Sequence, residues 1–412
     1  VCFMTEMWER FSFYGMKALL FLYLTKYHLF TDDNGYLLLG TYAGLAYALP
    51  LLGGALADRW LGMRKAVVFG GMLLVLGQLG MAYTGTPAQG ITGQANQDAF
   101  AIQIMYASLA LIAVGVGFLK PNISTIVGRL YADNDPRRDS GFTIFYMGIN
   151  AGAFFAPFIC ASWIGQTYGY RWGFFSAGIG MILGLMVFQL LKGWLGHVGT
   201  APEGKKGFAP VIQVLLAAAV MVIPVYYLLS KSDILGVLLI GMMLALVAYF
   251  VYSGVRSGDK VQLHRYIAML ILFVANILFW ALFEQAGSSL TFLAQDFVKM
   301  PDVSILGWTP TFEVFQSVNP VFIILLAPVF ATLWIKLDKA EWNPSIPRKF
   351  AYGMAGAALG FYVLVFAIQN FVDAGGKISW VWLALTYLIH TMGELCLSPV
   401  GLSLVTKLSP AA

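Results

Sequence analysis

The stretch AFAIQIMYASLALIAVGVGFLKPNISTIVGRL, residues 99–130, is apolar almost throughout, and Lys120 is its only charged residue before Arg129. A helix of about 20 apolar residues is long enough to cross the hydrocarbon core of a bilayer. The whole chain has the same character, because 59% of its 412 residues are hydrophobic and 11% are charged, against roughly 25% charged residues in soluble domains. The sequence therefore predicts an all-α polytopic membrane protein that lies in the lipid bilayer.

Similar apolar runs lie on both sides of this stretch. Lys and Arg gather in every second loop, from the loop that follows the second run to the one that follows the tenth, whereas 85–98 and 372–376 nearly lack them. Basic loops stay on the cytoplasmic side, so both ends of the chain are expected there. The predicted spans are 3–29, 35–57, 66–84, 99–130, 141–164, 172–195, 209–229, 234–253, 264–297, 311–335, 349–371 and 379–406.

One internal repeat indicates how the spans are grouped. The segment KPNISTIVGRL, 120–130, lines up with SPVGLSLVTKL, 398–408. With the spans in 209–253 set aside as lipid-facing spacers, these segments end the fourth and tenth spans, in the parallel-repeat order of a six-plus-six transporter. The alternative is a chance similarity of two helix ends. The expected domains are an N-terminal six-helix bundle (1–195), a cytoplasmic linker with two extra transmembrane helices (196–261), and a C-terminal bundle with four of six helices (262–412).

Seven ionisable residues lie well inside the predicted spans. Each costs about 2.5–3.5 kcal/mol on insertion scales, so such residues face a cavity or the bundle interior. Four carboxylates oppose three cations, and a lone buried carboxylate takes up a proton rather than stay charged. One of the Glu residues is therefore a predicted proton site, unless the charges only pin helices together as buried ion pairs. The seven are Glu6, Glu9, Arg10, Lys17, Lys120, Glu284 and Glu394.

The signs of these charges indicate the kind of solute. The three cations lie in the first half of the chain, and Glu284 and Glu394 lie in the second. A cavity with both signs suits a zwitterion such as a short peptide, whereas a sugar needs neutral groups and a lipophilic drug needs few charges. Aromatic walls tolerate varied side chains, and the candidates are Tyr14, Tyr47, Trp280 and Phe283. The net charge of +5 gives no support for nucleic-acid binding.

Two motifs carry a resemblance to a known family. GALADRWLGMRK, 54–65, resembles the loop motif of the major facilitator superfamily. EMWERFSFY, 6–14, is similar to the first-helix signature of the proton-dependent oligopeptide transporters, of the prokaryotic type. The fold expected from this resemblance is the major facilitator fold, with two six-helix bundles, two extra linker helices, and the last two core helices outside this chain. Further similar stretches are 117–122, 145–152, 279–285, 316–320 and 393–399.

The resemblance implies roles for individual residues. The proton-coupling cluster is Glu6, Glu9 and Arg10, and Glu284 is a protonatable partner of a first-helix cation. The sequence departs from the family pattern at Phe13, which replaces a Tyr, at Lys17, which often is Arg, and at Gly40, where animal members carry His. The implied peptide-binding residues are Arg10, Lys17 and Lys120 for the carboxylate, Glu394, Asn150 and Asn319 for the amino end, and Tyr14, Tyr47, Trp280 and Ser398 for the pocket walls.

The expected function is proton-coupled import of di- and tripeptides by alternating access. Protons are the coupling ion, and no other cofactor, no metal and no enzymatic activity are expected. The expected form is a monomer in a bacterial cytoplasmic membrane. The alternative function is that of another facilitator, which carries nitrate or another anion or exports a drug. The carboxylate of Glu394 disfavours an anionic solute. An intramembrane enzyme would need a nucleophile–base pair or metal ligands, and neither His264 nor His390 has such partners in its neighbourhood in the sequence.

Overall fold

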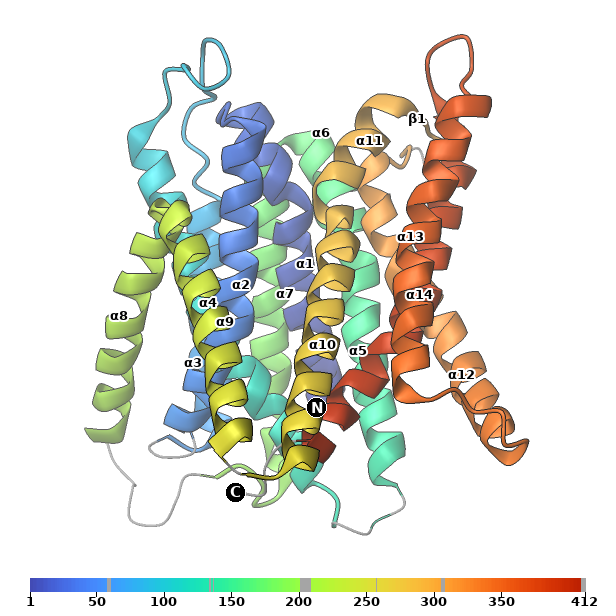
Figure 1. Ribbon diagram of the computed structural model, residues 1–412. Helices are drawn as coiled ribbons and strands as arrows, with labels where there is room; N and C mark the ends of the chain where they lie inside the picture. The colour runs from blue at the N-terminus through green and yellow to red at the C-terminus, as the bar shows by residue number, and fades with distance from the viewer. Residues whose placement is uncertain are drawn as a thin grey trace. The chain divides into compact units, whose positions relative to one another are not determined.

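The computed structural model describes residues 1–57, 61–132, 135, 137–200, 209–256, 258–304 and 308–408, with the side chains of 138–140, 209–211 and 398–408 excepted. The described chain is almost entirely helical (Figure 1). The helices are α1 (Cys2–Leu22), α2 (Asp32–Leu56), α3 (Met63–Met81), α4 (Ala99–Arg129), α5 (Arg138–Ala156), α6 (Gln166–Tyr168), α7 (Tyr170–Leu191), α8 (Ala209–Ser230), α9 (Ser232–Arg256), α10 (Lys260–Phe283), α11 (Ser289–Phe297), α12 (Val318–Lys339), α13 (Ile346–Asn370) and α14 (Trp380–Leu408).

The predicted membrane spans are confirmed to within a few residues. Among the described residues, 11 helical segments are long and apolar enough to cross a membrane. The remaining predicted span, 3–29, corresponds to α1. This helix differs from the other eleven because three of its charged residues are buried. The span predicted at 264–297 contains an interruption, because a 3₁₀ turn at Glu284–Gly287 separates α10 from α11. Glu284 therefore lies at the end of a helix rather than in its middle.

The chain divides into two compact units, Val1–Gly236 and Val237–Ala412. Helix α8 belongs to the first unit and packs on α4, where the Tyr226 hydroxyl donates a hydrogen bond to Gln103 and the Tyr226 ring meets Tyr106. The prediction of two lipid-facing spacers is therefore wrong for one face of α8, because Tyr226 on that face contacts Gln103 and Tyr106 of α4. In the most apolar 18-residue stretch of α9, only 6% of the residues are buried, as expected of a lipid-facing helix.

The second unit has its own apolar core. Two short strands, β1 (Val298–Lys299) and β2 (Ile378–Ser379), pair in parallel next to it. The ring of Phe315 stacks on Tyr387 of α14, with 6.4 Å between the ring centroids. Burial of such aromatic rings is a large favourable contribution to packing. This core fixes α14 against the turn that precedes α12, and so places the residues of α12 and α14 that are considered below.

Close helix contacts in the first unit depend on glycines of the 145–152 motif. Gly148 and Gly152 are four residues apart on the face of α5 that touches α1, and a Cβ atom at Gly152 would lie 2.1 Å from the Met7 carbonyl oxygen. Small residues at this spacing let two helix backbones approach closely. The motif therefore has a packing function, which brings α5 against the charged face of α1.

We expect Gly152→Leu to destabilise the first unit, because no side chain fits between α5 and Met7. Overpacking of this kind costs about 1–3 kcal/mol or more, which thermal unfolding in detergent would detect as a lower Tm. The control is Gly40→Ala, since a Cβ at Gly40 meets nothing within 4 Å; its Tm should be unchanged or slightly higher. An unchanged Tm in Gly152→Leu would contradict this account of the motif.

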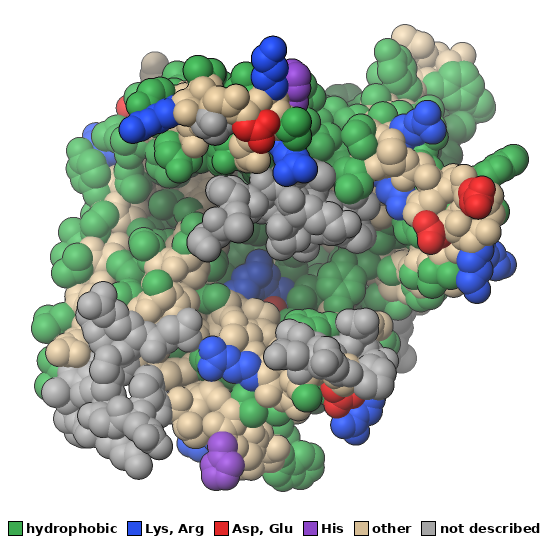
Figure 2. Space-filling model, turned by 60° about the horizontal axis from the view of Figure 1, so that its bottom comes forward, with side chains coloured by type: hydrophobic (Ala, Val, Ile, Leu, Met, Phe, Trp, Pro, Cys, Tyr) green, Lys and Arg blue, Asp and Glu red, His purple; other side chains and the backbone are tan. Residues whose placement is uncertain are grey.

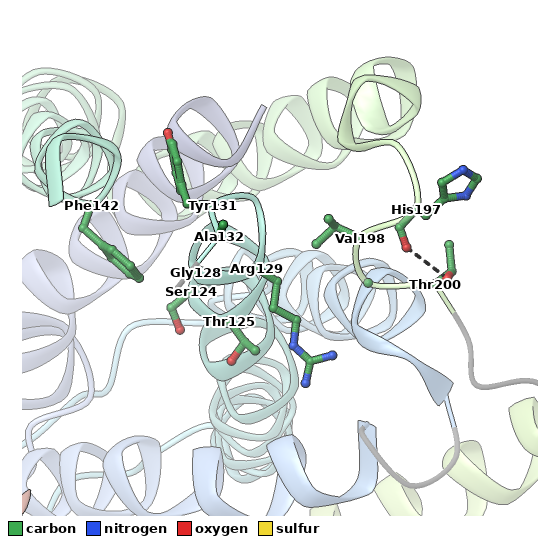
Figure 3. A pocket seen from close by; sticks show the side chains of 11 residues that line it. Ser124, Thr125, Gly128, Arg129, Tyr131, Ala132, Phe142, His197, Val198 and Thr200 are labelled. Carbon is green, nitrogen blue, oxygen red and sulfur yellow. Dashed lines mark hydrogen bonds between the residues drawn. The ribbon is translucent and has the colours of Figure 1, made fainter. Parts of the chain in front are cut away.

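Basic side chains mark one end of the helices. Figure 2 views the ends drawn at the bottom of Figure 1 and shows Lys and Arg side chains spread among apolar ones. In the first unit, Arg64 at the start of α3 binds the segment that follows α7: its Nε donates to the Val198 carbonyl (2.6 Å) and its Nη2 to the Gly196 carbonyl (2.7 Å). Between this segment and the end of α4 lies an open polar cavity of about 960 Å³ (Figure 3).

Candidate functional site

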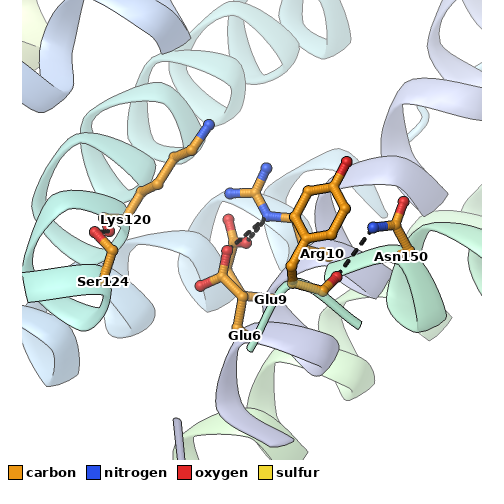
Figure 4. A network of polar contacts seen from close by, with 7 residues as sticks. Glu6, Glu9, Arg10, Lys120, Ser124 and Asn150 are labelled. Atoms are coloured by element: carbon orange, nitrogen blue, oxygen red, sulfur yellow. Dashed lines mark hydrogen bonds and ion pairs between the residues drawn. The ribbon is translucent and has the colours of Figure 1, made fainter. Parts of the chain in front are cut away.

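Three charged side chains of α1 form a buried cluster. Glu6, Glu9 and Arg10 are each at most 4% exposed. The Arg10 Nε lies 2.5 Å from Glu9 Oε2 and 3.2 Å from Glu6 Oε1 (Figure 4). Glu6 and Arg10 are four residues apart and so share one face of the helix, and the neighbouring residue Glu9 also reaches the same guanidinium. The structure thus brings together the three residues predicted to form the proton-coupling cluster.

The hydrogen bonding of this cluster is incomplete. Among the described residues, no protein group bonds to Glu6 Oε2, Glu9 Oε1 or Arg10 Nη2, although all three atoms are buried. Leaving buried polar groups unpaired is costly. A carboxylate oxygen in this position can accept a proton or a hydrogen bond, and the guanidinium N–H can donate a hydrogen bond to a polar solute.

Two aromatic rings border the cluster. The Arg10 guanidinium lies 5.3 Å from the centroid of Phe13, which in turn stacks on Tyr42. The Lys120 ammonium of α4 lies 5.1 Å from the centroid of Tyr47 and interacts electrostatically with the cluster. Cation–π contacts of this kind contribute about 0.5–2 kcal/mol. Phe13, which departs from the family pattern, therefore supports Arg10 with its ring face.

The position of Lys120 follows from the 117–122 motif. Pro121 has no N–H, so the Gly117 carbonyl has no partner within the helix. A Cβ at Gly53 of α2 would lie 2.2 Å from that carbonyl oxygen, so the two backbones touch there. The Asn122 amide donates to the Phe118 carbonyl at 2.7 Å. The close approach of Gly53 and Gly117 holds α4 against α2, and the Lys120 ammonium lies against the Tyr47 ring of α2.

The other predicted residues of the first unit have different surroundings. Tyr14 and Lys17 are half-buried, and Tyr47 is 61% exposed. Asn150 is buried, but its amide donates to the Tyr146 carbonyl of its own helix at 3.0 Å. The Asn150 side chain is thus already engaged, and its predicted role with the peptide amino end stays a prediction.

In the second unit, Glu394 of α14 and Asn319 of α12 lie side by side. The Asn319 amide donates to Glu394 Oε2 at 2.8 Å and to the Thr391 hydroxyl at 3.0 Å. Glu394 is 9% exposed. Hydrogen bonds to an ionised acceptor are shorter and stronger than neutral ones, so Asn319 orients this carboxylate. The structure brings together two of the three residues predicted to hold the amino end of a peptide.

Glu284 is close enough to Glu394 for the two carboxylates to interact electrostatically. It follows an aromatic cluster of α10, in which the Trp280 ring meets Phe283 edge to face at 5.3 Å. Two carboxylates in one neighbourhood repel each other when both are ionised. The sequence alone did not indicate that Glu284 and Glu394 lie within electrostatic reach of each other.

Two buried charges escaped the sequence analysis. Glu313 is 1% exposed and accepts a hydrogen bond from the Thr311 hydroxyl at 2.5 Å. Lys349 is 9% exposed, and its ammonium lies 4.3 Å from the centroid of the Trp334 ring. Lys349, the first residue of the predicted span 349–371, lies in the first turn of α13. With these two residues, the seven ionisable residues of the predicted spans become nine. They comprise five carboxylates and four cations, so one carboxylate remains in excess. The predicted Ser398 side chain lies outside the described residues.

Comparisons with known proteins agree on the family. The sequence profile of the POT family matches residues 64–412. The chain is 35% identical to the peptide transporter YePEPT of Yersinia enterocolitica, over 99% of this chain and 81% of that protein. It is 33% identical to a di-/tripeptide transporter of Lactococcus lactis, over 100% of this chain and 83% of that protein.

Solved structures show the same fold. A crystal structure of a peptide transporter POT in complex with sulfate is 38% identical to this chain, with a TM-score of 0.79 over 100% of this chain and 82% of that one. This similarity confirms the predicted major facilitator fold. The chain is therefore a member of the POT family, whose members are membrane transporters.

Proposed function

We propose that this protein is a proton-coupled symporter that imports di- and tripeptides by alternating access. The single observation that supports it best is the buried cluster of Glu6, Glu9 and Arg10, in which two carboxylates share one guanidinium. Membership of a family with peptide-transporting relatives supports the substrate class. In this proposal the protein works as a monomer in a bacterial cytoplasmic membrane, and both ends of this chain lie on the cytoplasmic side.

In this proposal residues of opposite charge bind the two ends of the zwitterionic peptide. The first unit contributes cations for the carboxylate, namely Arg10, Lys17 and Lys120. The second unit contributes Glu394, oriented by Asn319, for the amino end. Protonation of Glu284 accompanies each transport cycle. Tyr14, Tyr47, Trp280 and Ser398 form pocket walls, and Asn150 assists near the amino end. The division into bundles 1–195 and 262–412 with linker 196–261 belongs to the same proposal.

Uptake into proteoliposomes tests this function. With an imposed proton gradient, labelled dipeptide should accumulate, unlabelled di- and tripeptides should compete, and free amino acids and nitrate should not. The rival of an anion carrier predicts competition by nitrate instead. Accumulation that is independent of the proton gradient would contradict the proposal.

We expect Asn319→Ala to raise the KM for dipeptide about tenfold or more, because Glu394 loses the donor that orients it. A hydrogen bond to a charged group contributes about 1.5–3 kcal/mol. Asn343→Ala is the matched control, since the exposed Asn343 also donates to a carboxylate, at Asp338 (2.9 Å), but away from Glu394. Equal KM values for the two variants would show that Asn319 has no part in binding.

A further inference from the structure

An apolar groove runs along the outer face of the first unit, between α3 and α7. It has a volume of about 510 Å³ and is lined almost entirely by apolar side chains. Several of these side chains are exposed in the described structure, among them Met72 (47%), Leu76 (56%) and Met186 (52%). Exposed apolar side chains on a membrane-spanning helix face lipid tails, because water would make such a surface costly. The groove is therefore wide enough and apolar enough to receive an acyl chain.

The groove continues into a second cavity of about 420 Å³ at the basic end of the helices. The two cavities share Val68, Met72 and Gln189 in their lining, so they adjoin each other, and we call the pair the channel. Among the described residues that line the second cavity there are three cations and no Asp or Glu. The cations, which we call the basic mouth, are Arg64, Lys65 and Lys192.

The basic mouth is a built site rather than a chance group of surface charges. Arg64 is held by its two bonds to the Gly196 and Val198 carbonyls, and its own backbone N–H donates to the Gly199 carbonyl at 2.9 Å. The Lys192 ammonium, which lines the second cavity, donates a hydrogen bond at 2.6 Å to Gln189, which lines both cavities. Both cations are thus positioned before any ligand arrives, which lowers the entropy cost of binding.

We propose that this channel binds one anionic phospholipid of the inner leaflet. Its phosphate lies at the basic mouth, and one acyl chain lies along the groove between α3 and α7. Basic pockets between transmembrane helices on the cytoplasmic side suit anionic head groups, and this end of α3 and α7 is the one expected to be cytoplasmic. Trp194, which is 81% exposed next to Lys192, is placed as an interfacial anchor. The site is independent of peptide transport.

Charge and shape together select this lipid class. A free phosphate would contact the basic mouth alone and leave the apolar groove unused. A phosphatidylcholine would bring a choline cation into a mouth with three cations, and like charges in one site disfavour binding. An anionic phospholipid such as phosphatidylglycerol matches both parts of the channel.

Native mass spectrometry of the detergent-purified protein tests the proposal with phosphatidylglycerol and phosphatidylcholine as probes. The wild type should retain one phosphatidylglycerol and bind phosphatidylcholine several-fold less. The double variant Lys65→Gln with Lys192→Gln should bind phosphatidylglycerol about 25-fold less, since each basic residue near a lipid surface contributes about fivefold. Arg64 is left unchanged because it also holds the 196–199 segment.

A second variant changes the shape of the channel and leaves its charges unchanged. Met72→Trp fills the junction of the two cavities and should also abolish phosphatidylglycerol binding. The control for the lysine variant is Lys336→Gln with Lys339→Gln, two exposed lysines in the last turn of α12. The control for Met72→Trp is Leu325→Trp, at an exposed apolar position of α12. Both controls should bind phosphatidylglycerol like the wild type. Unchanged binding in either test variant, equal loss in the controls, or displacement of the lipid by inorganic phosphate would overturn the proposal.

Discussion

Glu284→Gln is expected to abolish proton-driven accumulation of dipeptide while leaving exchange of peptide across the membrane intact. One pH unit supplies about 1.4 kcal/mol per proton, and 100 mV adds about 2.3 kcal/mol. Together they support roughly 500-fold accumulation per proton, which should fall to equilibration in the variant. Gln keeps the size and polarity of the side chain but cannot take up a proton, so binding and conformational exchange continue.

Counterflow of labelled dipeptide is measured in the same vesicles, because it reports binding and exchange without a proton gradient. Glu341→Gln serves as the matched control, because Glu341 is an exposed acid of the second unit; it should accumulate dipeptide like the wild type. If Glu284→Gln still accumulated dipeptide against its gradient, Glu284 would not carry the driving proton. If it lost both accumulation and counterflow, Glu284 would act in binding or folding instead.

Arg10→Gln should cause the largest loss of stability of any single charge substitution in the first unit. It leaves Glu6 and Glu9 as two buried carboxylates without their guanidinium. Removing one partner of a buried ion pair costs about 3–5 kcal/mol. Thermal unfolding in detergent should show a strongly lowered Tm, and dipeptide uptake should be lost. Arg171→Gln is the control, since Arg171 is exposed and its loss should change neither quantity.

A triple variant separates folding from transport. When Glu6→Gln and Glu9→Gln are added to Arg10→Gln, no uncompensated carboxylate remains in the cluster, and neutral amides of similar size replace it. The Tm should recover most of its loss, whereas driven uptake should stay absent. Recovery of driven uptake in the triple variant would mean that the cluster has only a structural role.

The membrane spans and the cluster of α1 were predictable because both depend on local spacing. Twenty apolar residues specify a span wherever they occur, and Glu6, Glu9 and Arg10 are near neighbours on one helix. The 145–152 motif carries glycines to which the sequence analysis gave no packing role. What the sequence did not reveal is which helix each glycine touches, such as Gly152 against Met7.

The misses concern burial at the ends of helices. Glu313 and Lys349 lie within three or four residues of a helix start, where sequence alone does not tell a solvated end from a packed one. The Lys349 ammonium lies against Trp334, a contact that only the tertiary fold creates, whereas the Thr311 hydroxyl that donates to Glu313 is a local partner. The same reason explains why the Tyr226 contact of α8 and the approach of Glu284 to Glu394 were not foreseen.

The central claim is that buried carboxylates move protons together with a zwitterionic peptide. The most direct measurement is the pH inside proteoliposomes, reported by an entrapped dye, when a dipeptide is added outside without an imposed gradient. The account predicts that the lumen acidifies with dipeptide, does not acidify with free amino acids or nitrate, and stays at its initial pH for Glu284→Gln. Dipeptide that enters the wild-type vesicles without any change of lumenal pH would contradict it.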